Sequence, residues 1–111
     1  MKIDVSVVLK DLESKEIKIQ KPVGDKVELV DMRLKDACKE ALMGIYDDEK
    51  QVSGQEKFDR YQLATKIVLA DADCDLTVEE ISKIKSLIGK SYGPAIVGPV
   101  YSLLEKKIFV I

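Results

Sequence analysis

Three aspartates at alternate positions, Asp71, Asp73 and Asp75, form the spacing in this sequence with the clearest chemical meaning. Carboxylates at positions one, three and five, followed by an apolar eighth residue, resemble the start of a calcium-binding EF-hand loop. Two requirements of that loop are missing, because Leu76 stands where glycine makes the sharp turn and Ser82 replaces the bidentate glutamate. The alternative is an acidic linker whose charges favour the N-terminus of the next helix. We therefore expect no cofactor, with calcium at the three aspartates as a minor alternative.

A second candidate is the apolar segment over residues 92–101, which contains two Gly-Pro steps and a tyrosine at each end. Tyrosine supplies contact area together with a hydroxyl, and it is favoured where proteins bind each other. The alternative is a pair of core helices joined by a tight corner. With one residue of the apolar tail added, the candidate partner-binding residues are Tyr92, Ile96, Val97, Tyr101 and Phe109.

Two short segments allow a structural and a functional interpretation each. The apolar run at 108–111 either adds a strand to the chain's own sheet or pairs with another chain, so a homodimer through a C-terminal strand is one alternative. The acidic run Asp47, Asp48 and Glu49 is predicted to be a solvated loop, with docking to a basic surface as its functional alternative.

The composition excludes several kinds of active site. The 111 residues include no histidine, so neither a Ser–His–Asp triad nor a zinc site with imidazole ligands can form. Cys38 and Cys74 form no Cys-x-x-Cys pair, and we expect two buried free thiols in a reducing cytoplasm. We accordingly predict that the protein is not an enzyme.

The charge pattern also restricts the class of partner. The net charge is −2, and Arg33 and Arg60 are the only arginines, so nucleic-acid binding is not expected. No apolar run approaches the roughly 20 residues of a membrane span, and no leader-like segment opens the sequence. We expect a cytoplasmic protein with a protein partner and no membrane contact.

The elements that must position these residues begin with strands. Alternating apolar residues over 3–9 and again over 16–20 predict two strands that pair as an antiparallel hairpin. A turn is predicted at residues 22–25, followed by a short third strand at 27–30.

Helical periodicity follows the strands. One apolar stripe over residues 34–45 predicts a first helix that is capped by Asp31 and ended by Gly44 in a left-handed conformation. A second helix is predicted over residues 54–70, beginning with a capping box at Ser53. Its predicted inward residues are Phe58, Tyr61, Ala64, Thr65 and Val68.

The third and last helices are separated by Gly-Pro steps. Thr77 and Glu80 predict a capping box for a third helix that ends near Tyr92. Pro99 would remove a hydrogen bond inside a continuous last helix, so we predict a break at Gly98. The predicted inward residues of the third helix are Ile81, Ile84, Leu87 and Ile88.

Together these patterns predict one α+β domain over residues 1–111. It consists of a small N-terminal antiparallel sheet, made of the hairpin and the short third strand, packed against three to four helices. In one alternative the C-terminal strand joins that sheet.

Residues 53–64, which read Ser-Gly-Gln-Glu-Lys-Phe-Asp-Arg-Tyr-Gln-Leu-Ala, and residues 76–105 resemble small proteins encoded by tailed bacteriophages and prophages. The opening Met-Lys-Ile-Asp-Val and the following Leu-Lys-Asp turn resemble the start of those proteins, and the resemblance is loosest over residues 23–36. The relatives carry a polar residue and a larger aromatic residue where this chain has Pro99 and Tyr101. The resemblance implies a phage or prophage origin and carries over no functional residues.

The predicted function is therefore non-enzymatic protein binding that modulates a host or phage protein in the infected cell. The alternative is a structural or assembly accessory protein of the phage head or tail. A calcium-binding helix-loop-helix module is the minor alternative.

Overall fold

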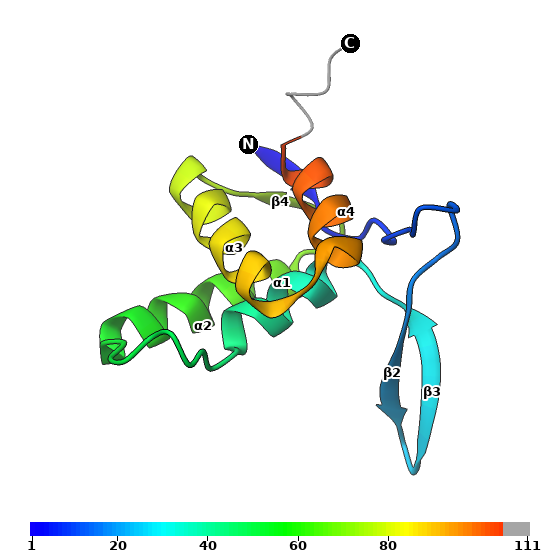
Figure 1. Ribbon diagram of the computed structural model, residues 1–111, viewed down its shortest axis with the longest axis horizontal. Helices are drawn as coiled ribbons and strands as arrows, with labels where there is room; N and C mark the ends of the chain where they lie inside the picture. The colour runs from blue at the N-terminus through cyan, green and yellow to red at the C-terminus, as the bar shows by residue number, and fades with distance from the viewer. Residues whose placement is uncertain (106–111) are drawn as a thin grey trace.

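The computed structural model describes residues 1–105, and this part of the chain forms four helices and two small antiparallel sheets (Figure 1). The predicted α+β class is confirmed. The predicted C-terminal strand at 108–111, with Phe109, lies outside the described residues. In chain order the elements are β1 (Lys2–Asp4), β2 (Lys18–Val23), β3 (Lys26–Asp31), α1 (Leu34–Met43), α2 (Gly54–Leu69), β4 (Asp73–Asp75), α3 (Val78–Ser91) and α4 (Pro94–Leu104).

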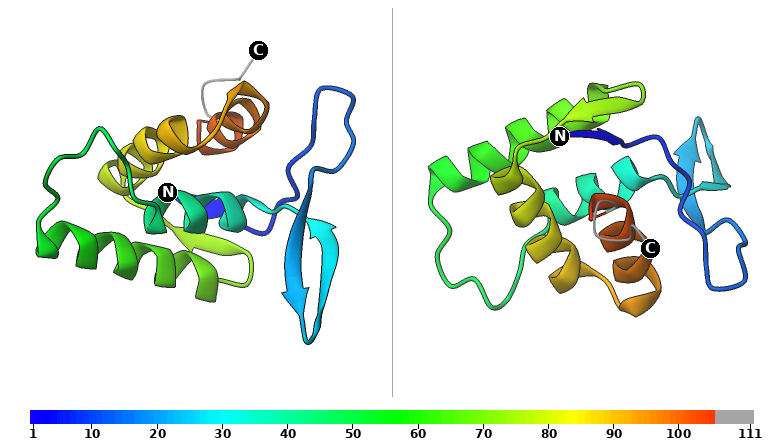
Figure 2. Two further views of the ribbon diagram at one scale, coloured as in Figure 1. Left: turned by 60° about the horizontal axis from the view of Figure 1, so that its bottom comes forward. Right: turned by 90° about the horizontal axis from the view of Figure 1, so that it is seen from above.

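Helix α1 is the centre of the helical part, since it contacts both α2 and α3, while α4 packs on α3 (Figures 1 and 2). The predicted start of α3 is confirmed: the Thr77 hydroxyl accepts the Glu80 backbone N–H, and the Glu80 carboxylate accepts the Thr77 N–H. The predicted inward face of α3 is also confirmed, because all four of its residues are buried. The core residues of α1 are Leu34, Ala37, Cys38, Ala41 and Leu42.

Strand β1 pairs with β4 and not with β2, so the predicted first hairpin is wrong. Ile3 lies opposite Cys74, and both side chains are buried. The strand ends after Asp4 because its carboxylate accepts hydrogen bonds from the backbone N–H and the hydroxyl of Ser6, at 2.9 and 2.5 Å. Such a local bond turns the chain. Of the pairing expected between residues 3–9 and 16–20, the structure keeps only an isolated antiparallel bridge next to it, between Lys10 and Glu16.

The start of α1 explains where the chain goes after that turn. The carbonyls of Val7 and Val5 accept hydrogen bonds from the first two amides of α1, at 2.8 and 2.9 Å. The predicted cap at Asp31 is wrong. Arg33 occupies the N-cap position, and the Asp36 carboxylate accepts its N–H at 2.8 Å. Because residues 5–7 satisfy helix donors, they are not available to pair with β2.

Strands β2 and β3 form a hairpin that projects from the helices (Figures 1 and 2). The predicted third strand is confirmed, and the turn lies at Gly24, whose φ of +62° favours glycine. From the middle of β2, the Lys21 ammonium donates to the Asp36 carboxylate at 2.6 Å. Asp36 is buried, so this bond anchors the hairpin to the start of α1.

Helix α4 is continuous from Pro94 to Leu104, so the predicted break at Gly98 is wrong. Pro94 occupies the first turn, as the sequence predicted, and Pro99 lies inside the helix. Burial of Val100 and Leu104 in the core offsets the one backbone bond that a proline removes.

Candidate functional site

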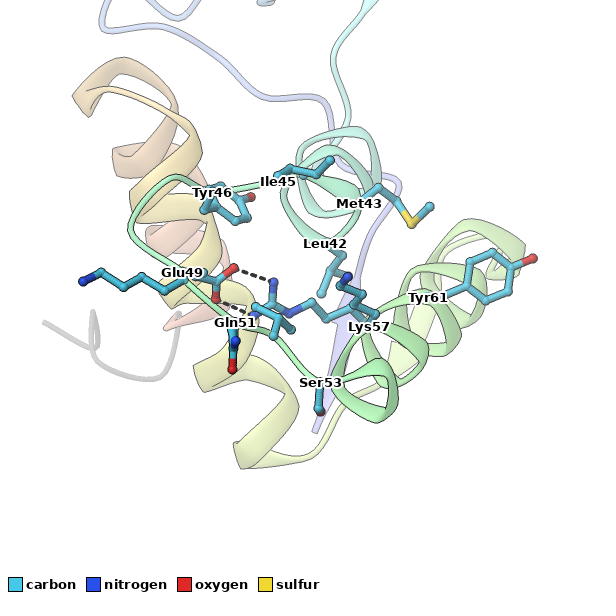
Figure 3. Close-up of a pocket in the computed structure, with 13 residues that line it drawn as sticks. Leu42, Met43, Ile45, Tyr46, Glu49, Gln51, Ser53, Lys57 and Tyr61 are labelled. Atoms are coloured by element: carbon cyan, nitrogen blue, oxygen red, sulfur yellow. Dashed lines mark hydrogen bonds and ion pairs between the residues drawn. The ribbon is translucent and has the colours of Figure 1, made fainter.

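A groove opens between the C-terminal end of α1 and the first half of α2, under the loop formed by residues 44–53 (Figure 3). We call it the α1–α2 groove, and its volume is about 800 Å³. Its lining side chains come from all three segments, as Figure 3 shows. The residues used below are Met43, Ile45, Glu49, Lys50, Lys57, Arg60 and Tyr61.

The loop is held over the groove by ion pairs. The Arg60 guanidinium donates two hydrogen bonds to the Glu49 carboxylate, at 3.0 and 2.6 Å, and a third to Glu56 at 2.8 Å. Lys83 of α3 reaches the other oxygen of Glu56 at 3.0 Å. Lys90 of α3 lies 3.5 Å from the Glu49 carboxylate. A bidentate arginine–carboxylate pair fixes geometry as well as charge, so the loop has one defined position.

These contacts change the pKa values of the groups involved. The hydrogen bonds and charge of Arg60 lower the pKa of Glu49 to about 2. Burial favours the neutral form of Glu56, but its bonds to Arg60 and Lys83 outweigh that effect and lower its pKa. Glu49 therefore stays ionised and paired at neutral pH. Within the acidic run at 47–49, Asp48 also lies 3.3 Å from the Lys90 ammonium, so two of its three carboxylates are paired and not simply solvated.

Tyr46 connects the loop to α1 and α3. Its hydroxyl donates to the carbonyl of Ala41 and lies 2.5 Å from the Ser91 hydroxyl. A Cβ at Gly44 would lie 2.8 Å from the Tyr46 hydroxyl oxygen, so glycine leaves room for this contact. Gly44 does end α1, but its φ is −75°, and the predicted left-handed ending is wrong.

The rim of the groove is apolar and exposed. Ile45, predicted to lie on the buried stripe of the first helix, is 98% exposed because α1 ends before it. Met43 and Tyr61 are 54% and 55% exposed. The predicted inward face of α2 is wrong in most positions: Phe58, Tyr61, Thr65 and Val68 are exposed, whereas Leu63, Ala64 and Ile67 are buried.

Two lysines also line the groove. Lys50 and Lys57 line the groove, and neither forms an ion pair with any residue in the described range 1–105. The nearby Glu49 carboxylate is already neutralised by Arg60. The groove thus combines apolar surface with two unpaired positive charges, in a chain whose net charge is negative.

The three aspartates of the predicted calcium loop lie on or beside a strand. Asp73 and Asp75 belong to β4, where Cys74 between them points into the core. The N-terminal ammonium of Met1 donates to the Asp75 carboxylate at 3.1 Å and lowers its pKa. Asp71 precedes the strand and is exposed. Among residues 1–105, no group of three or more acidic or cysteine side chains is arranged to hold a metal ion.

Four of the predicted partner-binding residues lie at the end of α3 and in α4. Tyr92, Ile96, Val97 and Tyr101 are all partly buried and pack against core residues. The Tyr101 hydroxyl donates to the Lys85 carbonyl at 2.6 Å. Burial raises the pKa of Tyr92 to about 12. The Tyr101 hydrogen bond joins α4 to α3, as the packing alternative has it, and partner binding by this segment stays a prediction.

Both cysteines are buried free thiols, as the sequence predicted. Burial raises the pKa of Cys38 to about 12, and it raises the pKa of Cys74 as well. A thiolate is the reactive form of cysteine, so neither side chain is prepared to act as a nucleophile at neutral pH.

No protein-family model, curated protein or solved structure matches this chain. None of the helices in residues 1–105 has the length and apolar character needed to cross a bilayer. The function therefore has to be inferred from the geometry of the molecule. The residues that sequence reasoning missed are Met43, Ile45, Lys50, Lys57 and Tyr61.

Proposed function

We propose that this chain is a non-enzymatic protein-binding module whose α1–α2 groove takes an acidic amphipathic segment of another protein. The resemblance to phage and prophage proteins supports a host or phage protein as the partner, in the cytoplasm of the infected bacterium. Binding would modulate that partner by covering the segment.

The observation that carries the proposal is the exposed apolar rim beside two unpaired lysines. Met43, Ile45 and Tyr61 offer contact area that gains free energy when water is removed. Lys50 and Lys57 favour carboxylates on the occupant and disfavour a basic segment. The ion pair between Arg60 and Glu49 holds the groove in place before binding, so little ordering is needed when a partner arrives.

The proposal is tested by selecting short displayed peptides on the intact protein and sequencing the binders. We expect the selected peptides to combine large apolar residues with aspartate or glutamate. In protein NMR, the best peptide should shift the resonances of Ile45, Lys57 and Tyr61. Selection of basic peptides, or shifts confined to other surfaces, would contradict the proposal.

Two matched pairs of variants distinguish binding in the groove from non-specific binding elsewhere on the surface. Ile45→Asp should weaken peptide binding by about tenfold or more. Leu12→Asp should not, because Leu12 is equally exposed but lies outside the groove. Lys57→Glu should weaken binding more than Lys10→Glu, since Lys10 lies outside the groove. Equal effects within either pair would argue against recognition in the groove.

The second candidate function is a structural or assembly accessory protein of a phage head or tail. The open edge of β3 favours it, because a component of a particle must bind copies or neighbours. The gene of such a protein should lie among morphogenesis genes. A modulator should be encoded outside that block and copurify with one partner through the groove.

A further inference from the structure

We propose that the outer edge of β3 pairs with the same edge of a second copy, which would form one four-stranded antiparallel sheet from two hairpins. This inference concerns a surface separate from the α1–α2 groove and does not depend on the proposed function. Within residues 1–105, β2 is the only strand beside β3. A two-stranded hairpin that projects into water is marginally stable, and added strands stabilise it.

The hydrogen-bond pattern of the hairpin shows which groups face outward. The Met32 backbone N–H donates to the Ile17 carbonyl at 2.7 Å, and these two residues continue the register of the hairpin. Hydrogen-bonded and non-hydrogen-bonded pairs alternate along an antiparallel ladder. Val27, which lies opposite Pro22, therefore belongs to a non-hydrogen-bonded pair, as does Leu29 two residues further. The N–H and C=O groups of Val27 and Leu29 point away from β2.

The two edges of the hairpin differ in their capacity to pair. On the β2 edge, Pro22 has no N–H to donate, and Lys18 adds a charge. Proline and lysine are the residues that protect edge strands from further pairing. The β3 edge carries no proline, and its one lysine, Lys26, lies at the end of the strand next to the turn. The Val27 and Leu29 side chains on one face of β3 are 65% and 68% exposed. The structure thus leaves β3, and not β2, open to another strand.

Charge complementarity selects a second copy as the occupant. If a two-fold axis passes through Val27, Lys26 of each chain lies opposite Glu28 of the other, which gives two cross-strand ion pairs. Neither Lys26 nor Glu28 has an ion pair within the described residues 1–105. An axis at Glu28 would place two glutamates opposite each other, and an axis at Leu29 would place the partner's hairpin tip at the start of α1. The axis at Val27 avoids both.

The first test compares two proline substitutions that both leave the hairpin's own ladder intact. Val27→Pro removes an outward N–H from β3, whereas Gln20→Pro removes an outward N–H from β2. In sedimentation equilibrium, we expect the intact protein to dimerise and Val27→Pro to raise the dimer dissociation constant by about tenfold or more. Gln20→Pro should leave that constant unchanged. A monomer at all accessible concentrations, or equal effects of both variants, would overturn the proposal.

The second test uses the predicted ion pairs. Lys26→Glu and Glu28→Lys should each weaken self-association, because like charges then face each other across the axis. Mixing the two variants should restore association, since every facing pair in the mixed dimer is again of opposite charge. Each chain's own hairpin is unchanged by mixing, so recovery reports the contact between chains alone. Failure to recover would contradict the register.

A third measurement distinguishes this edge from the C-terminal tail. Amide hydrogen exchange should show protection of Val27 and Leu29 that increases with protein concentration, because their amides are the outward ones. A chain truncated after Glu105 should dimerise as the full chain does. Loss of the dimer on truncation, with no effect of Val27→Pro, would show that residues 106–111 make the contact instead.

Discussion

Tyr61 of α2, a helix with several charged residues, and Tyr101 of α4, a helix with none, occupy opposite environments. Tyr101 packs against α3, where its hydroxyl bonds to the Lys85 carbonyl and the Lys85 ammonium lies 5.0 Å from the ring centre. Tyr61 stands on the open rim of the α1–α2 groove. The region around Tyr101 is held by packing, whereas the rim is exposed and the loop beside it is held by ion pairs at Arg60. The difference teaches that an apolar helix face becomes core only where another element covers it.

The largest expected effect separates the two tyrosines directly. Tyr101→Ala should lower the free energy of unfolding by about 2 kcal/mol, since it removes packing and a hydrogen bond together. Tyr61→Ala should change it by less than about 0.5 kcal/mol, because an exposed side chain contributes little. Urea unfolding of both variants measures the contrast. Similar losses for the two variants would mean that the rim is covered in the folded protein.

The next effect concerns the ion pairs beneath the rim. Arg60→Leu leaves Glu49 and Glu56 without their shared partner, so the midpoint of thermal unfolding should fall by about 5 °C. NMR shifts should change around the 44–53 loop and remain unchanged at Tyr101. Lys57→Leu is the matched control, since that lysine has no ion pair in residues 1–105, and it should leave the midpoint nearly unchanged.

A smaller effect is expected from pH. The pKa of Glu49 is lowered to about 2 in the folded protein, below its ordinary value of 4.5. A carboxyl with a depressed pKa stabilises the fold above its ordinary pKa, and this contribution is lost as the pH falls from 4.5 towards 2. Glu49→Gln should therefore be less stable than the intact protein at pH 7 and approach it in acid. The urea midpoint across this pH range checks the convergence, and a constant gap would contradict the pairing.

The smallest effect is expected at the three aspartates. Because β4 holds Asp73 and Asp75 extended, and the N-terminal ammonium already occupies Asp75, millimolar calcium should raise the unfolding midpoint by less than about 2 °C. A larger rise that is lost in Asp73→Asn would support the calcium alternative and require these carboxylates to converge when the ion binds.

The sequence by itself determined the features that depend on neighbouring residues. The start of α3 at Thr77 and its inward isoleucines and leucines could be predicted, because a capping box and a 3.6-residue period are local properties. The ends of α2 and the turn at Gly24 were predictable for the same reason. The α+β class followed from the order of these local patterns.

Only the tertiary structure decided which surfaces meet. Residues 5–7 resemble strand in their alternation, yet the carbonyls of Val5 and Val7 bond to the first amides of α1. Strand β1 pairs with a strand some 70 residues away. Helix α2 has apolar residues on two sides, and periodicity alone does not say that the side with Leu63 and Ile67 faces α1. The groove arises from that choice, because it leaves Tyr61 exposed at the edge of the groove. Contacts between segments distant in sequence depend on the shape of the whole chain, and no local pattern encodes that shape.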